Sequence, residues 1–341
     1  MAISPYLTDK VPKKQKWDIE KLAEGIQKGD IATLSKAISL IESQLVDDIS
    51  YQKQLLQIIK PPSNISKRFA ISGIPGVGKS TFIEKFGLEI LNLEPNSKIA
   101  VLTIDPTSNL RNGSILGDKT RMSLLSNHKR AYVRPSPTSG NLGGVTITTR
   151  KIISLCESAG FDNLIIETVG VGQSEVSAHY MTDCFILFLL PNTGDDIQGI
   201  KRGIMEIADI IVLNKCDLFP KSELYSKEIS LALSISKTSI GLRNWETPVL
   251  LNSSFTEESI TNIIQISNLF FNKSISSGAF SLRRKSQLVQ SFNEALNIEI
   301  IQRLNSNKLY QENRKIALKA IESGKLNLEQ VLDNCLNFLL K

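Results

Sequence analysis

Residues 73–81 read Gly-Ile-Pro-Gly-Val-Gly-Lys-Ser-Thr and match the phosphate-binding loop pattern G-x-x-x-x-G-K-[ST]. Its glycines let the backbone approach a polyphosphate, so that successive N–H groups and the start of the following helix face the anion. In this pattern Lys79 reaches the β- and γ-phosphate oxygens, and the Ser80 hydroxyl binds Mg²⁺. The predicted phosphate-binding residues are therefore Gly73, Ile74, Pro75, Gly76, Val77, Gly78, Lys79, Ser80 and Thr81.

The sequence on both sides of this loop supports the prediction. Residues 68–72 form a short apolar run of strand type, and residues 81–93 carry apolar side chains at helical spacing. A strand, a glycine loop and a helix are the setting that a phosphate-binding loop requires. The alternative, a glycine turn that binds nothing, does not account for this context.

A second motif indicates which nucleotide binds. Residues 209–217 read Asp-Ile-Ile-Val-Leu-Asn-Lys-Cys-Asp, an apolar strand that ends in N-K-x-D. The Asp217 carboxylate can accept the N1–H and 2-amino donors of guanine, which adenine lacks on that edge. Asn214 can bridge the base N7 and the phosphate loop, and the Lys215 stem can cover the base or ribose. Alone the tetrapeptide is weak, but downstream of a phosphate-binding loop it predicts GTP or GDP as the ligand.

Composition restricts the class of protein. The 341 residues are 41% hydrophobic with a formal net charge of +6, and Lys and Arg are scattered rather than gathered in a patch. We therefore expect neither nucleic-acid nor membrane binding, since no apolar run is long enough to span a bilayer. Four cysteines without a C-x-x-C pair, and an N-terminus without a signal-peptide pattern, favour a cytoplasmic protein.

The chain alternates between strand and helix patterns in its middle part. Short apolar runs at 68–72, 99–105, 163–167, 184–190, 209–213 and 247–251 predict strands buried on both faces. This pattern predicts an α/β fold with a mostly parallel sheet flanked by helices. We expect an N-terminal helical extension at 1–65, a P-loop domain at 66–260 and a C-terminal helical region at 261–341. Residues 134–145, rich in Pro, Ser and Gly, are expected to be irregular.

Polar segments follow the ends of the predicted strands, at 73–80, 105–108, 167–175, 191–199 and 214–217. In a parallel sheet these segments converge on one crevice. Asp105 and Glu167 can hold Mg²⁺ there, and the Gly170 N–H can meet the γ-phosphate, as acid-x-x-Gly does in GTPases. For Gln173 two interpretations stay open: it orients the attacking water, or it stabilises the loop.

Together the motifs resemble the MeaB/ArgK family of G-protein chaperones. The resemblance rests on residues 73–81, 105–106, 113–122, 134–145, 167–175, 194–206 and 214–217. It implies a homodimeric GTPase that gates adenosylcobalamin loading and protection of methylmalonyl-CoA mutase or a related acyl-CoA mutase. It also implies that Ser80, Asp105 and Glu167 serve Mg²⁺, and that Asp118, Arg121, Asp195 and Lys201 fall in mobile switch loops.

The sequence departs from this family at two places. Residues 107–113 lack the usual Ser-Ser and glycine pair, and Asn252-Ser253-Ser254-Phe255 stands where the family has Ser-Ala. We still expect the backbone of Ser253, Ser254 and Phe255 to contact guanine. No arginine lies in 73–81, so Lys201 and Arg121 are the cations expected to stabilise the transition state.

Two other functions remain open from the sequence. A kinase would transfer the γ-phosphate, as the family's older transport-kinase label suggests; no dedicated base motif is present, although Asp118 is a candidate. A non-catalytic, nucleotide-gated scaffold would bind without turnover. The acyl-CoA mutase is equally open, since methylmalonyl-, isobutyryl- and ethylmalonyl-CoA mutases are all acceptable partners.

Overall fold

The computed structural model describes residues 17–62, 64–105, 122–137, 142–168, 173–191, 202–236, 245–253, 256–323 and 327–336. By its internal contacts the chain divides into two compact units, Met1–Ser277 and Gly278–Lys341. The first contains the sheet, and the second consists of helices. The expected three-part division at 65 and 260 stays a prediction.

A seven-stranded sheet forms the centre of the first unit. Its order is β3-β2-β4-β1-β5-β6-β7, and every neighbouring pair is parallel. The strands are β1 (Lys67–Gly73), β2 (Ile99–Asp105), β3 (Ala131–Pro137), β4 (Asn163–Thr168), β5 (Cys184–Leu189), β6 (Ile210–Leu213) and β7 (Val249–Leu251). The expectation of a parallel α/β sheet is confirmed, and β1, which leads into the phosphate-binding loop, lies centrally.

One expectation about this sheet is wrong. Residues 134–145 were expected to be irregular, but β3 runs to Pro137 and helix α7 (Leu142–Ser158) begins soon after. Proline lacks a ladder donor, which argues against a central strand. Strand β3 lies at the sheet edge and pairs only with β2. An edge strand forms ladder hydrogen bonds on one side only, so it tolerates proline and the strand can form.

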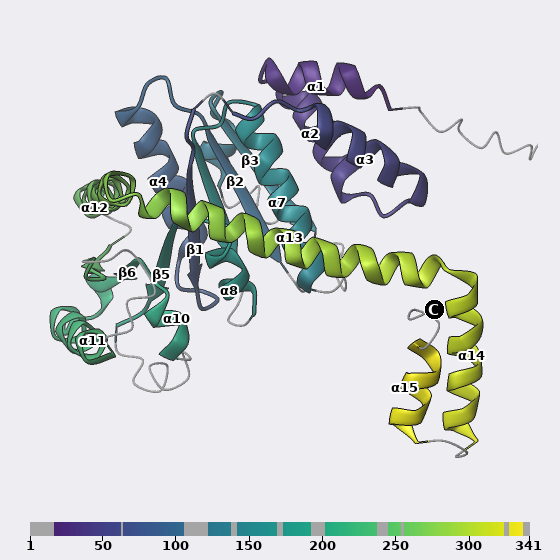
Figure 1. Cartoon of the computed structure of the whole chain (residues 1–341). Helices are drawn as coiled ribbons and strands as arrows, with labels where there is room; N and C mark the ends of the chain where they lie inside the picture. The colour runs from purple at the N-terminus through teal and green to yellow at the C-terminus, as the bar shows by residue number, and fades with distance from the viewer. Residues whose placement is uncertain are drawn as a thin grey trace, which may run out of the picture. The chain divides into compact units, whose positions relative to one another are not determined.

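Different helices pack against the two faces of the sheet. Side chains alternate along each strand, so Phe69 points to one face and Ala70 to the other. Phe69 packs edge-on against Phe86 of α4 (Lys79–Leu93) and Phe271 of α12 (Glu257–Ser276), with ring centroids 5.5 and 5.3 Å apart. Ala70 belongs to the core that contains residues of α7 and the N-terminal helices. The helices therefore bury both faces (Figure 1).

Three N-terminal helices extend the core on the α7 face. They are α1 (Ile19–Gln27), α2 (Ile31–Glu42) and α3 (Val46–Ile58). Asp30 caps α2 by accepting from Thr33 N at 2.8 Å, as its position after Gly29 predicts. Arg134 of β3 pairs with Glu42 of α2 at 2.5 Å, so the sheet edge is tied to this extension.

The described part of the first unit contains further helices. They are α6 (Ser123–Ser126), α8 (Gln173–His179), α10 (Arg202–Glu206), the 3₁₀ helix η2 (Cys216–Leu218) and α11 (Ser222–Ser236). The second unit holds α13 (Ala279–Ser306), α14 (Lys308–Glu322) and α15 (Leu328–Leu336). Among the described residues, no helix is both long enough and apolar enough to cross a membrane.

Arg68 of β1 and Glu157 of α7 form an ion pair on this face of the sheet. Its removal provides a test of how the face is packed. Arg68 Nε lies 2.7 Å from Glu157 Oε1 and Arg68 Nη2 lies 2.8 Å from Oε2, and the Glu157 side chain is 5% exposed. Removing one partner leaves a buried charge without its counterion, so Glu157→Ala should lower the free energy of unfolding by about 3–5 kcal/mol. Denaturant titration measures this change.

The control is the more exposed pair Lys67–Glu94, whose side chains are 30% and 39% exposed. Glu94→Ala should cost about 1 kcal/mol or less. Equal losses in the two variants would contradict the role given to burial at Glu157.

Candidate functional site

The phosphate-binding loop joins the end of β1 to the start of α4, as predicted. Gly76 and Gly78 have φ angles of 79° and 100°, which side chains rarely adopt. A Cβ on Gly78 would lie 2.6 Å from Asn214 Nδ2, and one on Gly73 would lie 2.4 Å from the Phe188 carbonyl oxygen. Glycine is therefore required at positions 76 and 78 by the backbone conformation, and at positions 73 and 78 by the lack of space for a Cβ atom.

Side chains hold the loop by its carbonyl groups. Lys79 Nζ donates to Gly73 O at 2.6 Å and to Ile74 O at 3.1 Å. Lys215 Nζ donates to Gly76 O at 2.8 Å, and Asn214 Nδ2 donates to Val77 O at 2.7 Å. Because donors occupy the carbonyl side of the loop, its backbone N–H groups are the ones suited to an anionic ligand.

Lys79 is the buried cation of the site, with 7% of its surface exposed. Burial lowers the pKa of its ammonium group, and the negative charges of Glu167 and Glu175 act in the opposite direction and raise it. The two carboxylates thus favour a charged Lys79 in a poorly solvated place. A charged lysine at this position can bind phosphate oxygens.

Ser80 and Glu167 lie in direct contact beside Lys79. Ser80 Oγ, in the first turn of α4, donates to Glu167 Oε1 of β4 at 2.9 Å. Asp105 ends the neighbouring strand β2, although its side chain lies outside the described part. Hydroxyl and carboxylate oxygens are the ligands that Mg²⁺ prefers, and it is commonly held by one or two carboxylates together with phosphates.

The donor set therefore fits Mg²⁺ bound together with a nucleotide. Within the described ranges, no group of three or more His, Cys, Asp or Glu side chains could hold a metal by itself.

Glu175 belongs to this cluster, but the sequence reasoning gave it no role. It lies in the first turn of α8, and 1% of its surface is exposed. An acidic residue in the first helical turn after an acid-x-x-Gly motif is the signal that points to it. Its charge acts on Lys79, so α8 is electrostatically coupled to the phosphate-binding loop.

The N-K-x-D residues follow β6 and face the same loop. Asn214 is fully buried, and its backbone N–H donates to Leu189 O at the end of β5. Lys215 has a φ of 59°, and it is the only non-glycine residue with positive φ in the described part of the chain. This backbone conformation directs its side chain back to Gly76, while Asp217 lies exposed in η2.

Asn252, directly after β7, is a second contact of Asn214 that the sequence reasoning did not identify. Its Nδ2 donates to Asn214 Oδ1 at 2.6 Å. Ser253 follows it and is partly buried. The signal in the sequence was an asparagine directly after a strand that neighbours the N-K-x-D strand.

Several predicted site residues cannot be located. Asp118, Arg121, Gly170, Lys201, Ser254 and Phe255 lie outside the described residues, as does Asp195. For Gln173, only the backbone position at the start of α8 is described. The structure thus brings together Gly73–Ser80, Glu167, Asn214 and Lys215, and it leaves the expected switch residues as predictions.

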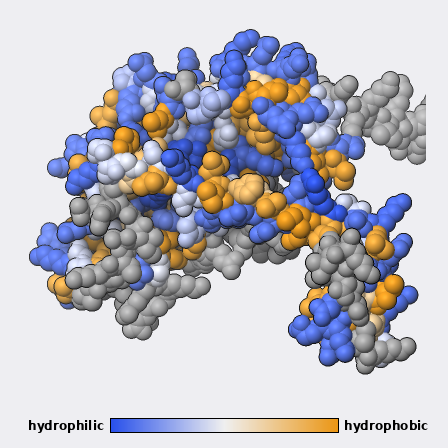
Figure 2. All heavy atoms as spheres, viewed as in Figure 1, coloured by the Kyte–Doolittle hydropathy of each residue, from blue (hydrophilic) through white to orange (hydrophobic). Residues whose placement is uncertain are grey.

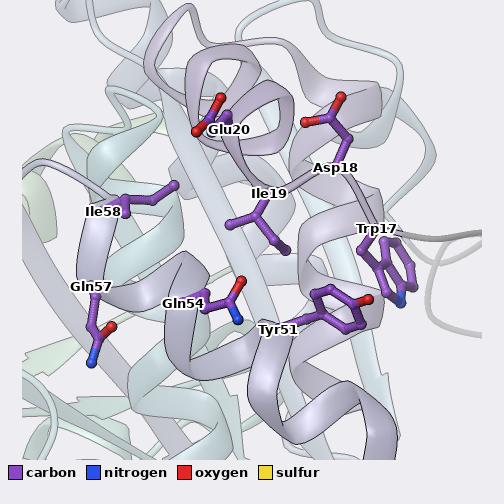
Figure 3. A pocket seen from close by; sticks show the side chains of 8 residues that line it. All are labelled: Trp17, Asp18, Ile19, Glu20, Tyr51, Gln54, Gln57 and Ile58. Atoms are coloured by element: carbon purple, nitrogen blue, oxygen red, sulfur yellow. The ribbon is translucent and has the colours of Figure 1, made fainter.

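The chain also has a surface hollow of about 540 Å³ between the start of α1 and α3 (Figure 3). Trp17, Asp18, Tyr51 and Gln54 are among its lining residues. None of the predicted nucleotide-binding residues lines it, so it is separate from the site above.

Comparison with known proteins agrees with this geometry. The family described as Methylmalonyl Co-A mutase-associated GTPase MeaB matches residues 34–309. A probable GTPase of Mycobacterium tuberculosis is 40% identical over 310 residues, which are 90% of this chain and 91% of that protein. GTPase ArgK of Escherichia coli is 36% identical over 90% of this chain and 93% of its own length.

Two further similarities extend this result. A mitochondrial methylmalonic aciduria type A homolog of Caenorhabditis elegans is 38% identical over 91% of this chain and 80% of that protein. A solved structure titled LAO/AO transport system kinase has a TM-score of 0.71 and 29% sequence identity, and it covers 95% of this chain and 98% of its own. The match over residues 34–309 and these relatives show that the chain belongs to the MeaB family of methylmalonyl-CoA mutase-associated GTPases.

Proposed function

We propose that this chain binds GTP and hydrolyses it to GDP and phosphate. The observation that carries the proposal is the 2.7 Å hydrogen bond from Asn214 Nδ2 to Val77 O, because it joins the N-K-x-D motif to the phosphate-binding loop. A ligand that meets both needs a purine base and a phosphate chain. Relatives of similar length that are named GTPases support hydrolysis.

The residues of the phosphate side have complementary roles in this proposal. Loop N–H groups bind the β-phosphate, and Lys79 moves from the Gly73 and Ile74 carbonyls to the β/γ oxygens. Ser80, Asp105 and Glu167 hold Mg²⁺, which neutralises phosphate charge when bound. The Gly170 N–H contacts the γ-phosphate, and Gln173 orients the attacking water.

On the base side, Asp217 accepts the two guanine donors, and Lys215 covers the base or ribose. The backbone of Ser253, Ser254 and Phe255 faces the guanine carbonyl. Transition-state charge is stabilised by Lys201 or Arg121, since residues 73–81 contain no arginine.

A kinase is the second candidate, because the similar solved structure is titled as one. The two functions differ in where the γ-phosphate goes. Incubation with γ-labelled GTP gives free phosphate for a GTPase and a labelled acceptor for a kinase, for which Asp118 is the candidate base. Saturable GTP binding without either product would indicate a nucleotide-gated scaffold.

The proposed partner is an adenosylcobalamin-dependent acyl-CoA mutase, whose cofactor loading and protection the GTPase cycle gates. The family description and the methylmalonic aciduria relatives support this partner. Methylmalonyl-, isobutyryl- and ethylmalonyl-CoA mutases remain candidates. Co-purification with one of them would identify which it is.

We also propose that the chain forms a homodimer through its C-terminal helical region. Helices α13 to α15 expose large apolar side chains to solvent (Figure 2). Among them are Leu288 at 71%, Phe292 at 63% and Ile316 at 66% exposure. Extensive exposed apolar surface of this kind marks an interaction site in a soluble protein.

Asp217→Asn should weaken GTP binding by about 2–4 kcal/mol and favour xanthosine triphosphate. The amide places a donor against the guanine donors, whereas xanthine offers a carbonyl at that edge. Equilibrium binding of both nucleotides to both proteins measures the switch. Unchanged GTP affinity would remove the guanine assignment.

Lys79→Ala should lower kcat for GTP hydrolysis about a hundredfold or more, because Lys79 meets charge that grows in the transition state. Circular dichroism should stay near that of the unmodified protein. Lys85→Ala, an exposed lysine on the same helix, is the matched control and should keep its turnover. Full turnover of Lys79→Ala at saturating Mg²⁺ and GTP would refute the phosphate-loop mechanism.

Hydrolysis should be slow for the chain alone and faster with the mutase. Placing a positive group at the phosphates raises GTPase rates by about 10³–10⁵. Lys201→Ala should therefore abolish most of the stimulation and leave GTP affinity nearly intact, whereas the exposed Lys221→Ala should not. Steady-state phosphate release tests this. Equal stimulation of Lys201→Ala and the unmodified protein would eliminate Lys201.

A further inference from the structure

Three polar side chains, of which Asn214 and Asn252 are buried and Ser259 is partly exposed, form a hydrogen-bonded chain at the carboxyl ends of β6 and β7. Ser259 Oγ donates to Asn252 Oδ1 at 2.9 Å, Asn252 Nδ2 donates to Asn214 Oδ1 at 2.6 Å, and Asn214 Nδ2 donates to Val77 O at 2.7 Å. Asn252 is 1% exposed and Asn214 is fully buried. The chain of bonds thus connects the start of α12 with the phosphate-binding loop.

The Val77 carbonyl, at the end of this chain of hydrogen bonds, determines the direction of the bonds between the side chains. The Val77 carbonyl can only accept, so Asn214 must present its NH₂ group to it. The Asn214 oxygen then faces Asn252, which must present its own NH₂ group in turn. The Asn252 oxygen consequently faces the Ser259 hydroxyl, whose single proton is shared between Asn252 Oδ1 and the Thr256 carbonyl oxygen, each 2.9 Å away. Reversing either amide would place two acceptors, or two donors, against each other at one of the contacts.

The sheet order explains why Asn214 needs this support. Strand β5 lies between β1 and β6, so the Asn214 side chain must reach across the end of β5 to the loop after β1. Its backbone N–H is held by Leu189 O on β5, but its side-chain orientation depends on its hydrogen-bond partners. Asn252 on the far side, at the end of β7, supplies the donor for its oxygen.

We propose that Asn252 is a positioning residue that acts together with the Val77 carbonyl to hold the amide orientation of Asn214 and thereby raises the affinity for purine nucleotides. The inference rests on the proposed function, in which the second N–H of the Asn214 NH₂ group is donated to N7 of the base. An amide held with NH₂ toward the loop and the base binds an acceptor without reorganisation. Without Asn252 only the bond to Val77 O holds this orientation, so the Asn214 amide presents its oxygen to N7 more often, where two acceptors repel.

The side chain of Asn252 can be tested separately from its backbone. Its backbone N–H donates to Leu213 O at 2.8 Å, and its carbonyl accepts from Cys216 N at 3.1 Å. A substitution keeps both backbone bonds, so the β6–β7 connection is retained. Losses on substitution therefore report on the amide group.

Asn252→Ala should raise the Kd for GDP about tenfold, the effect of losing one partner of a buried hydrogen bond. Ser259→Ala should raise it less, because it removes only the group that directs Asn252. Asn163→Ala is the matched control: Asn163 is a buried asparagine at the first position of β4 that donates to Ser97 Oγ at 2.7 Å. It should lower thermal stability and leave GDP affinity within about twofold.

Asn252→Asp supplies a readout that a purely structural role would not change. A carboxylate facing the Asn214 oxygen repels it, whereas a protonated carboxyl group can donate to it. Burial beside another acceptor raises the pKa of such a carboxyl group. The ratio of the GDP Kd of Asn252→Asp to that of the unmodified protein should therefore fall as pH decreases from about 8 to about 5. The same ratio for Asn252→Ala should stay flat.

Calorimetric titration with GDP, together with thermal unfolding of each variant, decides between the outcomes. Unchanged affinity in Asn252→Ala and Ser259→Ala, or a pH-independent ratio for Asn252→Asp, would overturn the positioning role while GDP still binds the unmodified protein. Failure of the unmodified protein to bind GDP would instead contradict the proposed function. If Asn252→Ala does not fold, Ser259→Ala keeps the inference testable.

Discussion

The parallel alignment of strands that are buried on both faces is the constraint on which the site depends. Strands such as β4 and β5 are covered on both sides, so polar groups that remain within reach of a ligand must lie at strand ends. Parallel pairing puts all carboxyl ends at one edge. Gly73, Glu167, Asn214 and Asn252 come from four strands and meet there for this reason.

At that edge, side-chain donors hold the phosphate-binding loop by its carbonyl groups, in addition to the packing of the buried Val77. Lys79, Lys215 and Asn214 donate to four loop carbonyls, and two of these donors come from the segment after β6. The residues expected to recognise the base therefore also shape the phosphate loop. These hydrogen bonds therefore connect the two ends of the proposed nucleotide site.

The buried charge of Lys79 is only partly compensated. Burial lowers the pKa of Lys79, and the negative charges of Glu167 and Glu175 oppose this effect without cancelling it. Ser80 in turn donates to Glu167. The Lys79 ammonium group donates to the loop carbonyls of Gly73 and Ile74, and in the proposed function it exchanges these acceptors for phosphate oxygens. Glu175 extends this balance to α8, the helix that follows the expected γ-phosphate sensor.

Local sequence determined the elements whose signals are local. The glycine loop, the N-K-x-D motif, the Asp30 cap and the strands other than β3 follow from apolar runs and turn residues at fixed spacing. Tertiary structure alone decided the rest. Proline in β3 is tolerated because that strand lies at the edge, which pairing order determines. Glu175 and Asn252 act at the site because helix and strand packing bring them to Lys79 and Asn214. These partners lie far apart in sequence, where no spacing rule operates.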